Sequence, residues 1–247
     1  MPQSTFYKLG RLTGGKVRKA KWMWHSLAGD EPEAIEAEYG VGRDMAAVVR
    51  ERSGVDDPAL ATLLDDTLGH LTPVVRNKLH RFHVGLVDEP EPTAYALPGG
   101  FIFVTSSLTN LCERNHDELA FVVAHEMSHV IRRHAINRVL RQTAYAAASV
   151  LTPGRGAIGP WLRKAGLEWL ERAYSQDQEF EADALGGLMM RAAGYDPEGA
   201  IRLFERFRAL GPLGGDEDTL GTYLSPHPPV NERIARLRKR LSKKTTS

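Results

Sequence analysis

The segment HEMSH, which begins at His125, constrains this chain more than any other feature, because it lies inside an apolar stretch with helical periodicity. The pattern predicts a buried helix that starts near Asn115 and continues to about Arg141. On such a helix His125 and His129 are four residues apart, so their side chains share one face. Two imidazoles placed this way can bind one metal ion, and Glu126 reaches the open side of that ion. The segment therefore predicts a helical zinc site in which Glu126 accepts a proton from water.

A catalytic zinc site needs a third protein ligand and one open position. In the long form of this motif, a glycine and a histidine follow the second histidine at three and six residues. Here those two positions hold Arg132 and Ala135, so the long form is excluded. His134 lies one residue before the position of that histidine, so on a continuous helix we expect its side chain to face solvent. The third ligand must therefore come from another part of the chain.

An acidic segment further along the chain, QDQEFEADALG, offers such a ligand. Ser175, with Gln178 three residues later, predicts the start of a second helix. On that helix Glu179 and Asp183 are four residues apart and share a face, whereas Glu181 points elsewhere and is expected on the solvent side. Glu179 could bind the metal while Asp183 hydrogen-bonds a ligand histidine and fixes the orientation of its ring.

The remaining patterns predict a mostly helical α+β fold. Residues 42–53 carry apolar side chains on one helical face, and Asp57 followed by Pro58 is typical of a helix N-terminus. Within residues 79–104 the apolar residues no longer follow helical spacing, and LHRFHVGLV predicts one strand. The segment TAYALPGGFIFVTSS predicts two further strands, separated at its Pro-Gly-Gly.

Charge and composition predict how the chain is organised. The first residues change from basic to acidic, which indicates an N-terminal arm, 1–40, beside one domain, 41–247. A net charge of +1 indicates no nucleic-acid partner, and the single cysteine, Cys112, excludes an intramolecular disulfide. No apolar run reaches the ~20 residues of a membrane span, and no apolar signal segment is present. We therefore expect a cytoplasmic protein, or a periplasmic one if a leader has been removed; the oligomeric state is not indicated.

Three segments, HEMSH, EFEAD and SPHPPVNERIARL, follow one another in an order that resembles a known family. They resemble zinc metallopeptidases of the HtpX and CAAX prenyl endopeptidase type, metallopeptidase family 48, over residues 75–240. The resemblance implies a gluzincin-type domain with one Zn²⁺ per chain, with Glu179 as third ligand and Asp183 as the partner of a ligand histidine. It implies that His227 acts on the oxyanion or caps the resting metal, and that Arg233 supports the same region. Without the membrane helices of HtpX, the chain looks more like the soluble bacterial branch.

The same family presents the edge of a small sheet beside the zinc helix, and PTAYALPGGFIFVTS resembles that segment. The resemblance implies that Ala96, Leu97, Gly99 and Gly100 form an edge to which a peptide substrate adds through backbone hydrogen bonds. The family usually has asparagine near the start of the segment, where this chain has Thr93 and Ala94.

Together these features predict a zinc-dependent endopeptidase that hydrolyses peptide bonds in extended or unfolded protein segments. Glu126, His227 and Arg233 are the expected catalytic residues. One alternative is a latent form in which His227 or the loop 211–227 covers the metal. Another is a non-catalytic zinc-binding module with a chaperone-like or interaction role. An intact Glu126 argues against this last alternative, because a structural zinc site does not use a general base.

Overall fold

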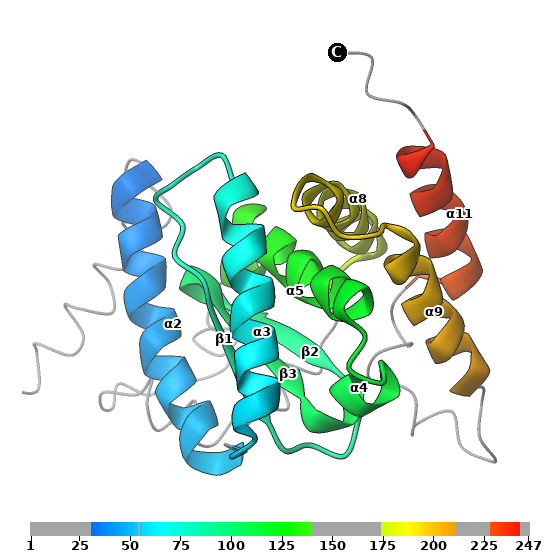
Figure 1. Cartoon of the computed structure of the whole chain (residues 1–247). Coiled ribbons are helices and arrows are strands. Elements are labelled where there is room, and N and C mark those ends of the chain that lie inside the picture. The colour runs from blue at the N-terminus through cyan, green and yellow to red at the C-terminus, as the bar shows by residue number, and fades with distance from the viewer. Residues whose placement is uncertain (1–30, 54, 140–173, 211–227, 243–247) are drawn as a thin grey trace, which may run out of the picture.

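The computed structural model describes residues 31–53, 55–139, 174–210 and 228–242. They form a small three-stranded sheet surrounded by helices, which confirms the predicted, mostly helical α+β fold (Figure 1). None of the described helices is both long and apolar enough to cross a membrane. The α-helices are α2 (Glu31–Ser53), α3 (Pro58–Leu71), α4 (Ser106–Leu111), α5 (His116–Ile131), α8 (Gln176–Ala192), α9 (Glu198–Leu210) and α11 (Val230–Leu241). The strands are β1 (His83–Val87), β2 (Ala94–Leu97) and β3 (Phe101–Thr105), and the 3₁₀ turns are η1 (Thr72–Val74) and η2 (Pro98–Gly100).

Strand β2 is an edge of the sheet, whose order is β1-β3-β2. It is antiparallel to β3, whereas β1 is parallel to β3. The carbonyl of Thr93 accepts a hydrogen bond from the N–H of Thr105 at 3.0 Å, so these residues are a hydrogen-bonded pair of the antiparallel ladder. Because hydrogen-bonded and non-hydrogen-bonded pairs alternate, Tyr95 and Leu97 direct their backbone groups toward β3. The N–H and C=O of Ala96 therefore point away from β3, toward the side of β2 that pairs with no other strand in the described part of the chain.

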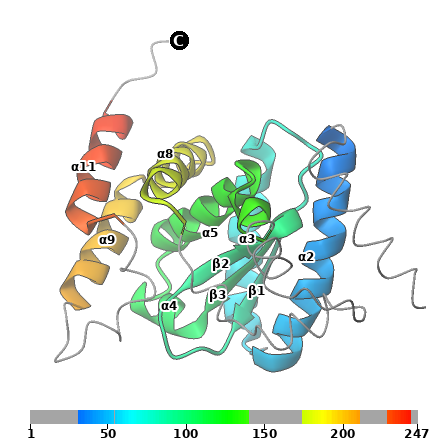
Figure 2. The ribbon, with the colours of Figure 1, turned by 180° about the vertical axis from the view of Figure 1, so that it is seen from behind.

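The two faces of the sheet pack against different helices. One face contributes to a core shared with α3, α5, α8 and α9, and the other packs against α2. Viewed from behind, the strands lie in front of α3 (Figure 2). Alternation of side chains along each strand produces this division. The face toward α3 and α5 carries Ala94, Ala96, Ile102 and Val104, and the face toward α2 carries Tyr95, Leu97, Phe101 and Phe103.

Helix α2 begins at Glu31, earlier than the apolar face of residues 42–53 indicates. Long-range contacts explain the extension. Glu38 is buried and its carboxylate lies 2.6 Å from Nη2 of Arg133, which is 95 residues away. Further along α2, a Cβ at Gly42 would lie 1.7 Å from the Pro98 carbonyl oxygen, so the helix backbone rests directly on the β2–β3 turn.

The division of the chain into an arm, 1–40, and a domain, 41–247, stays a prediction, since residues 1–30 lie outside the described part. Residues 31–40 and 41–53 form one continuous helix. The last part of the predicted arm is therefore joined to the domain by helical hydrogen bonds and shared packing.

Helix α5 ends at Ile131, well before the predicted end near Arg141. Arg133 adopts a left-handed conformation with φ 60°, and the chain is helical again from His134 to Val139. The sequence between the two helical parts contains no glycine or proline, so it carries no local signal for this break. Because the turn changes the direction of the chain, the side chains after Arg133 do not lie where a continuous helix would place them.

Candidate metal centre

Helix α5 supplies two histidines and a glutamate from a fully buried segment. Its N-terminus is capped by the side chain of Asn115, as predicted, which accepts hydrogen bonds from the second and third residues of the helix. His125 and His129 are one turn apart, and their Nε2 atoms lie 3.1 Å from each other. Both rings therefore point to one place on the helix surface.

Helix α8 brings two carboxylates to the same place. It starts with the predicted capping box, in which Ser175 and Gln178 bond each other's backbone N–H groups. A Cβ at Gly186 would lie 3.0 Å from the backbone nitrogen of His125, so α5 and α8 touch almost backbone to backbone there. This close approach places Glu179 and Asp183, both buried, beside the two histidines.

Three of these side chains could hold a metal ion. One Glu179 oxygen lies 3.5 Å from Nε2 of His125, and the other lies 3.6 Å from Nε2 of His129. The ligand atoms of all three residues lie within 4.8 Å of one another. For a tetrahedral zinc ion with bonds of ~2.0–2.1 Å, neighbouring ligand atoms are about 3.4 Å apart. The 3.1 Å between the two imidazole nitrogens, and a Glu179 oxygen 3.5 or 3.6 Å from each of them, are close to this spacing, so the three side chains could hold a zinc ion between them.

The carboxylate of Asp183 faces the other nitrogen of His125, with Oδ1 lying 3.1 Å from Nδ1. Arg233, from α11, donates two hydrogen bonds to the same carboxylate, at 2.8 and 2.6 Å. Burial by itself would raise the pKa of Asp183, but the guanidinium and the imidazole together lower it below its usual value. Asp183 is therefore an anion that orients the His125 ring. Arg233 also lies 3.5 Å from Glu179, so it contacts the carboxylates rather than the open side of the centre.

Glu126 lies on the inner side of α5 and is only 4% exposed. Burial raises the pKa of its carboxyl to about 6, and the backbone N–H of Ala96 is among the groups that lower it. The carboxylate thus lies where helix α5 meets the edge strand β2. A base with this pKa can accept a proton near neutral pH and release it again.

The predicted edge residues differ in what they present. Ala96 directs its N–H toward Glu126, and its carbonyl accepts a hydrogen bond from Nη2 of Arg138 at 3.1 Å. Leu97 turns its backbone groups toward β3. Gly99 and Gly100 lie in the η2 turn with positive φ, where they allow close backbone approach to neighbouring segments. Of the four, Ala96 directs its backbone groups to the edge beside the metal centre, where Glu126 and Arg138 are their partners.

His134 contradicts the sequence-based expectation of a solvent-facing side chain. It is 5% exposed, and its Nδ1 lies 3.1 Å from Nδ1 of His129. The turn at Arg133 causes this, because it replaces the continuous helix on which the expectation rested. Glu181 is half-exposed, in accord with its predicted position on the solvent side, and pairs with Arg132 at 3.0 Å. No local pattern in the sequence indicates that His134 returns to the metal ligands.

Tyr174 is a further residue of the centre that the sequence did not single out. Its ring stacks on the ring of His129, with centroids 3.7 Å apart and an interplanar angle of 15°. The guanidinium of Arg138 lies over the same tyrosine ring, 4.3 Å from its centroid. Burial raises the pKa of the Tyr174 hydroxyl, so the phenol stays neutral. The predicted residue His227 lies outside the described part of the chain.

Burial and nearby positive charge lower the pKa of His129 well below its usual value, so this ring is neutral, as a metal ligand must be. Burial also opposes the charged form of His125, but the carboxylates of Asp183 and Glu179 raise its pKa to about 9 when no cation is bound. Without a metal ion, His125 therefore carries a proton. Metal binding would release that proton.

Comparisons with known proteins agree with this geometry. The chain is similar to the mitochondrial metalloendopeptidase OMA1 of Arabidopsis thaliana, 33% identical over 62% of this chain and 30% of the relative, and to OMA1 of Saccharomyces cerevisiae, 30% identical over 66% and 48%. It is also 27% identical to the β-barrel assembly-enhancing protease of Escherichia coli, over 62% of this chain and 33% of that protein. The chain thus spans less than half the length of these relatives. A solved structure of Ste24p from S. mikatae covers 93% of this chain, and this chain covers 63% of it, with 17% identity and a TM-score of 0.43.

These relatives contradict the cytoplasmic location predicted from the sequence, because two of them are named as mitochondrial proteins. That prediction is therefore wrong. It rested on the absence of an apolar segment, which does not specify a compartment. The family assignment has broader support. The family model described as peptidase family M48 matches residues 59–241, which include all the residues of the metal centre described above. The chain therefore belongs to peptidase family M48, the family that its three motifs resemble.

Proposed function

We propose that this chain is a zinc-dependent endopeptidase that cleaves extended or unfolded protein segments. One observation carries the proposal. A buried group of two histidines and a glutamate that could hold a metal ion lies next to Glu126 and to the edge strand β2. The names of the relatives, metalloendopeptidase and protease, support the same reaction class.

The protein's own residues account for the proton transfers. When bound by His125, His129 and Glu179, zinc lowers the pKa of water to ~7 and polarises a peptide carbonyl. Glu126 accepts the proton that water loses as it attacks the carbonyl carbon. It then delivers that proton to the nitrogen of the leaving amine, which completes hydrolysis of the peptide bond. Burial raises the pKa of the Glu126 carboxyl, which makes its carboxylate a better proton acceptor.

The open edge of β2 supports a preference for extended segments. A peptide that adds to this edge as a further strand binds through its backbone, so it must be unfolded locally but needs no particular sequence. The outward N–H and C=O of Ala96 pair with Glu126 and Arg138, so a peptide strand would exchange with these partners as it binds. A peptide bound there would bring its own backbone close to the proposed base and metal ligands.

Cleavage of fluorescently labelled casein, a largely unfolded protein, tests the proposal. We expect turnover that is lost with a zinc chelator and restored by added zinc. Glu126→Gln should bind zinc as tightly as the wild type yet lose at least ~10²-fold in turnover, because it removes the base but keeps the shape. Glu51→Gln, which changes an exposed glutamate on α2, is the matched control and should leave turnover unchanged.

Activity in Glu126→Gln equal to that of the wild type would show that Glu126 is not the base. Zinc binding without cleavage by the wild type would instead favour the latent or the non-catalytic alternative. Within the described residues, the group that could hold a metal has three members.

A further inference from the structure

Two side chains that take no part in the proposed proton transfers enclose the ring of His129. His134 faces its Nδ1 at 3.1 Å, and the ring of Tyr174 covers its plane at 3.7 Å. All three side chains are at least nine-tenths buried. A buried imidazole with one edge and one face in contact has little freedom to rotate. These contacts therefore fix the direction in which the opposite nitrogen, Nε2, points.

The position of the metal ligands decides which nitrogen carries the proton. Nε2 of His129 faces His125 and Glu179, so it is the nitrogen left for a metal ion. The remaining nitrogen, Nδ1, must then be protonated and can donate to Nδ1 of His134. His134 accepts at Nδ1 only if its own proton is on Nε2, which lies 3.5 Å from a carboxylate oxygen of Glu181. The contacts are thus consistent with a single arrangement of protons along this chain of side chains.

The two ligand histidines therefore have different supports. His125 faces the carboxylate of Asp183, which Arg233 anchors. His129 faces a neutral imidazole and an aromatic ring instead. An outer partner that accepts from the free N–H of a ligand histidine fixes its tautomer and ring orientation. The arrangement on His129 performs the same task with different chemistry.

We propose that His134 and Tyr174 are positioning residues that hold the His129 ring for zinc and thereby set the affinity of the centre. The inference rests on the proposed zinc site. It depends on the break after α5, since only the turn at Arg133 brings His134 back to the ligand ring. Glu38 holds that turn through Arg133 from helix α2, which precedes the residues matched by the family model. The support of His129 is thus assembled partly by a helix outside that matched region.

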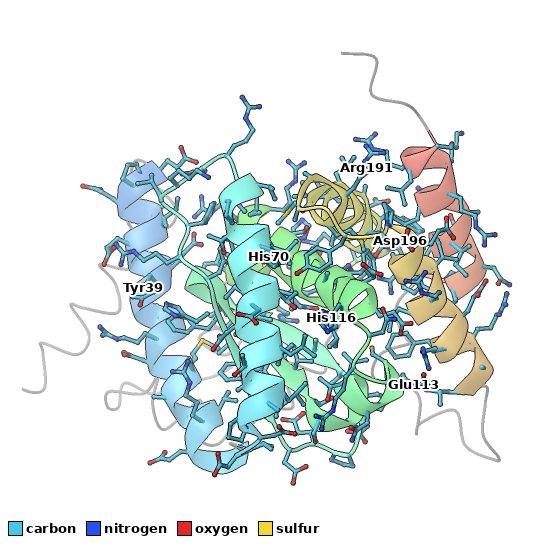
Figure 3. All side chains as sticks on the ribbon, viewed as in Figure 1. Tyr39, His70, Glu113, His116, Arg191 and Asp196 are labelled. Atoms are coloured by element: carbon cyan, nitrogen blue, oxygen red, sulfur yellow. The ribbon has the colours of Figure 1, made fainter. Side chains whose placement is uncertain are left out.

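Zinc affinity, measured by competition with a fluorescent chelator of known affinity, tests the roles of the two residues. His134→Ala should weaken zinc binding by roughly 10–100-fold, the usual effect of losing an outer partner of a ligand. His134→Asn should recover most of that loss, because the asparagine amide oxygen can take the place of Nδ1 as acceptor. The control is His116→Ala, which changes an exposed histidine at the first position of α5 (Figure 3).

Two variants separate the ring of Tyr174 from its hydroxyl. Tyr174→Phe keeps the stacked ring and should bind zinc like the wild type, whereas Tyr174→Leu should bind it more weakly. A Tyr174→Phe variant as weak as Tyr174→Leu would overturn the stacking role. Unchanged affinity in His134→Ala, or no recovery in His134→Asn, would overturn the role of His134. The melting temperature of each apo protein shows whether a variant has lost stability as well as zinc affinity. If His134 acts by positioning the His129 ring, His134→Asn should bind zinc more tightly than His134→Ala while the two variants melt at the same temperature.

The wild-type protein provides a measurement that no folding defect can affect. In ¹⁵N NMR of the zinc-loaded protein, His129 should carry its proton on Nδ1 and His134 on Nε2. A His134 ring protonated on Nδ1 would overturn the inference. Failure of the wild type to bind zinc would instead refute the proposed function, so the two failures are distinguishable.

Discussion

Replacing Asp183 with alanine should destabilise the apo protein and weaken zinc binding, and a second substitution should separate these two effects. Arg233 donates to both oxygens of Asp183, and the two side chains are 1% and 4% exposed. The guanidinium also lies over the Phe204 ring, 4.4 Å from its centroid. Truncation of the carboxylate would remove both of these hydrogen bonds, while Glu179, 3.5 Å away, would remain among the partners of the cation.

The expected size of the effect follows from burial. Removing one member of a buried ion pair costs about 3–5 kcal/mol, because the other charge is left uncompensated. For a chain of this size each kcal/mol lowers the melting temperature by ~2–4 °C, so Asp183→Ala should lose roughly 6–20 °C. Because the Glu179 carboxylate still lies near Arg233, we expect a loss in the lower half of that range. Replacing both charges, in Asp183→Leu with Arg233→Met, should restore much of the stability, since an apolar pair of similar volume needs no charge compensation.

Zinc affinity should not recover in the double variant. His125 would still lack the acceptor that faces its Nδ1, and loss of such a partner weakens metal binding by ~10–100-fold. Melting of the apo protein at pH 7 and chelator competition measure the two effects separately. At that pH the contribution of Asp183 is fully present, because its pKa is held below the usual value and the stabilisation is lost only as pH falls through the folded-state pKa.

An exposed ion pair on α11, the helix that carries Arg233, is the control for this experiment. Glu232 and Arg236 are four residues apart on α11, and Glu232→Ala should change stability by no more than about 0.5 kcal/mol. The reasoning would be refuted if Asp183→Ala cost no more than Glu232→Ala, or if the double variant bound zinc like the wild type.

Two further predictions concern the packing of the core. Gly186→Ala should weaken zinc binding, because its Cβ would press on the backbone of His125 at 3.0 Å and push α8 away from α5. Gly69→Ala on α3 is the control: its Cβ would meet no atom within 4 Å beyond its chain neighbours and the backbone of its own helix, so it should stabilise the protein by up to ~1 kcal/mol. Equal zinc affinity in Gly186→Ala and the wild type would contradict this. Burial raises the pKa of the Cys112 thiol to about 12, so iodoacetamide at pH 8 should label it only after the protein is unfolded in urea. Mass spectrometry measures the labelling, and rapid labelling of the folded protein would contradict the buried position.

Local patterns identified the elements that depend on neighbours in the sequence. The spacing within HEMSH requires His125 and His129 to share a helix face, and Ser175 with Gln178 caps the helix that carries Glu179. Helix periodicity and capping act over three or four residues, so they can be read directly from the chain. The choice of Glu179 over other acidic residues needed the resemblance to a family, because acidic residues on a helix are most often solvated.

What the sequence by itself determined is therefore the pair of histidines, the caps and the strands, each specified by residues within a few positions. Only the tertiary structure decided that Glu38 extends α2, that His134 turns inward and that Tyr174 covers His129. The physical reason is distance along the chain. Glu38 and Arg133 are 95 residues apart, and Tyr174 reaches His129 from the start of another helix, so these contacts exist only after the chain has folded.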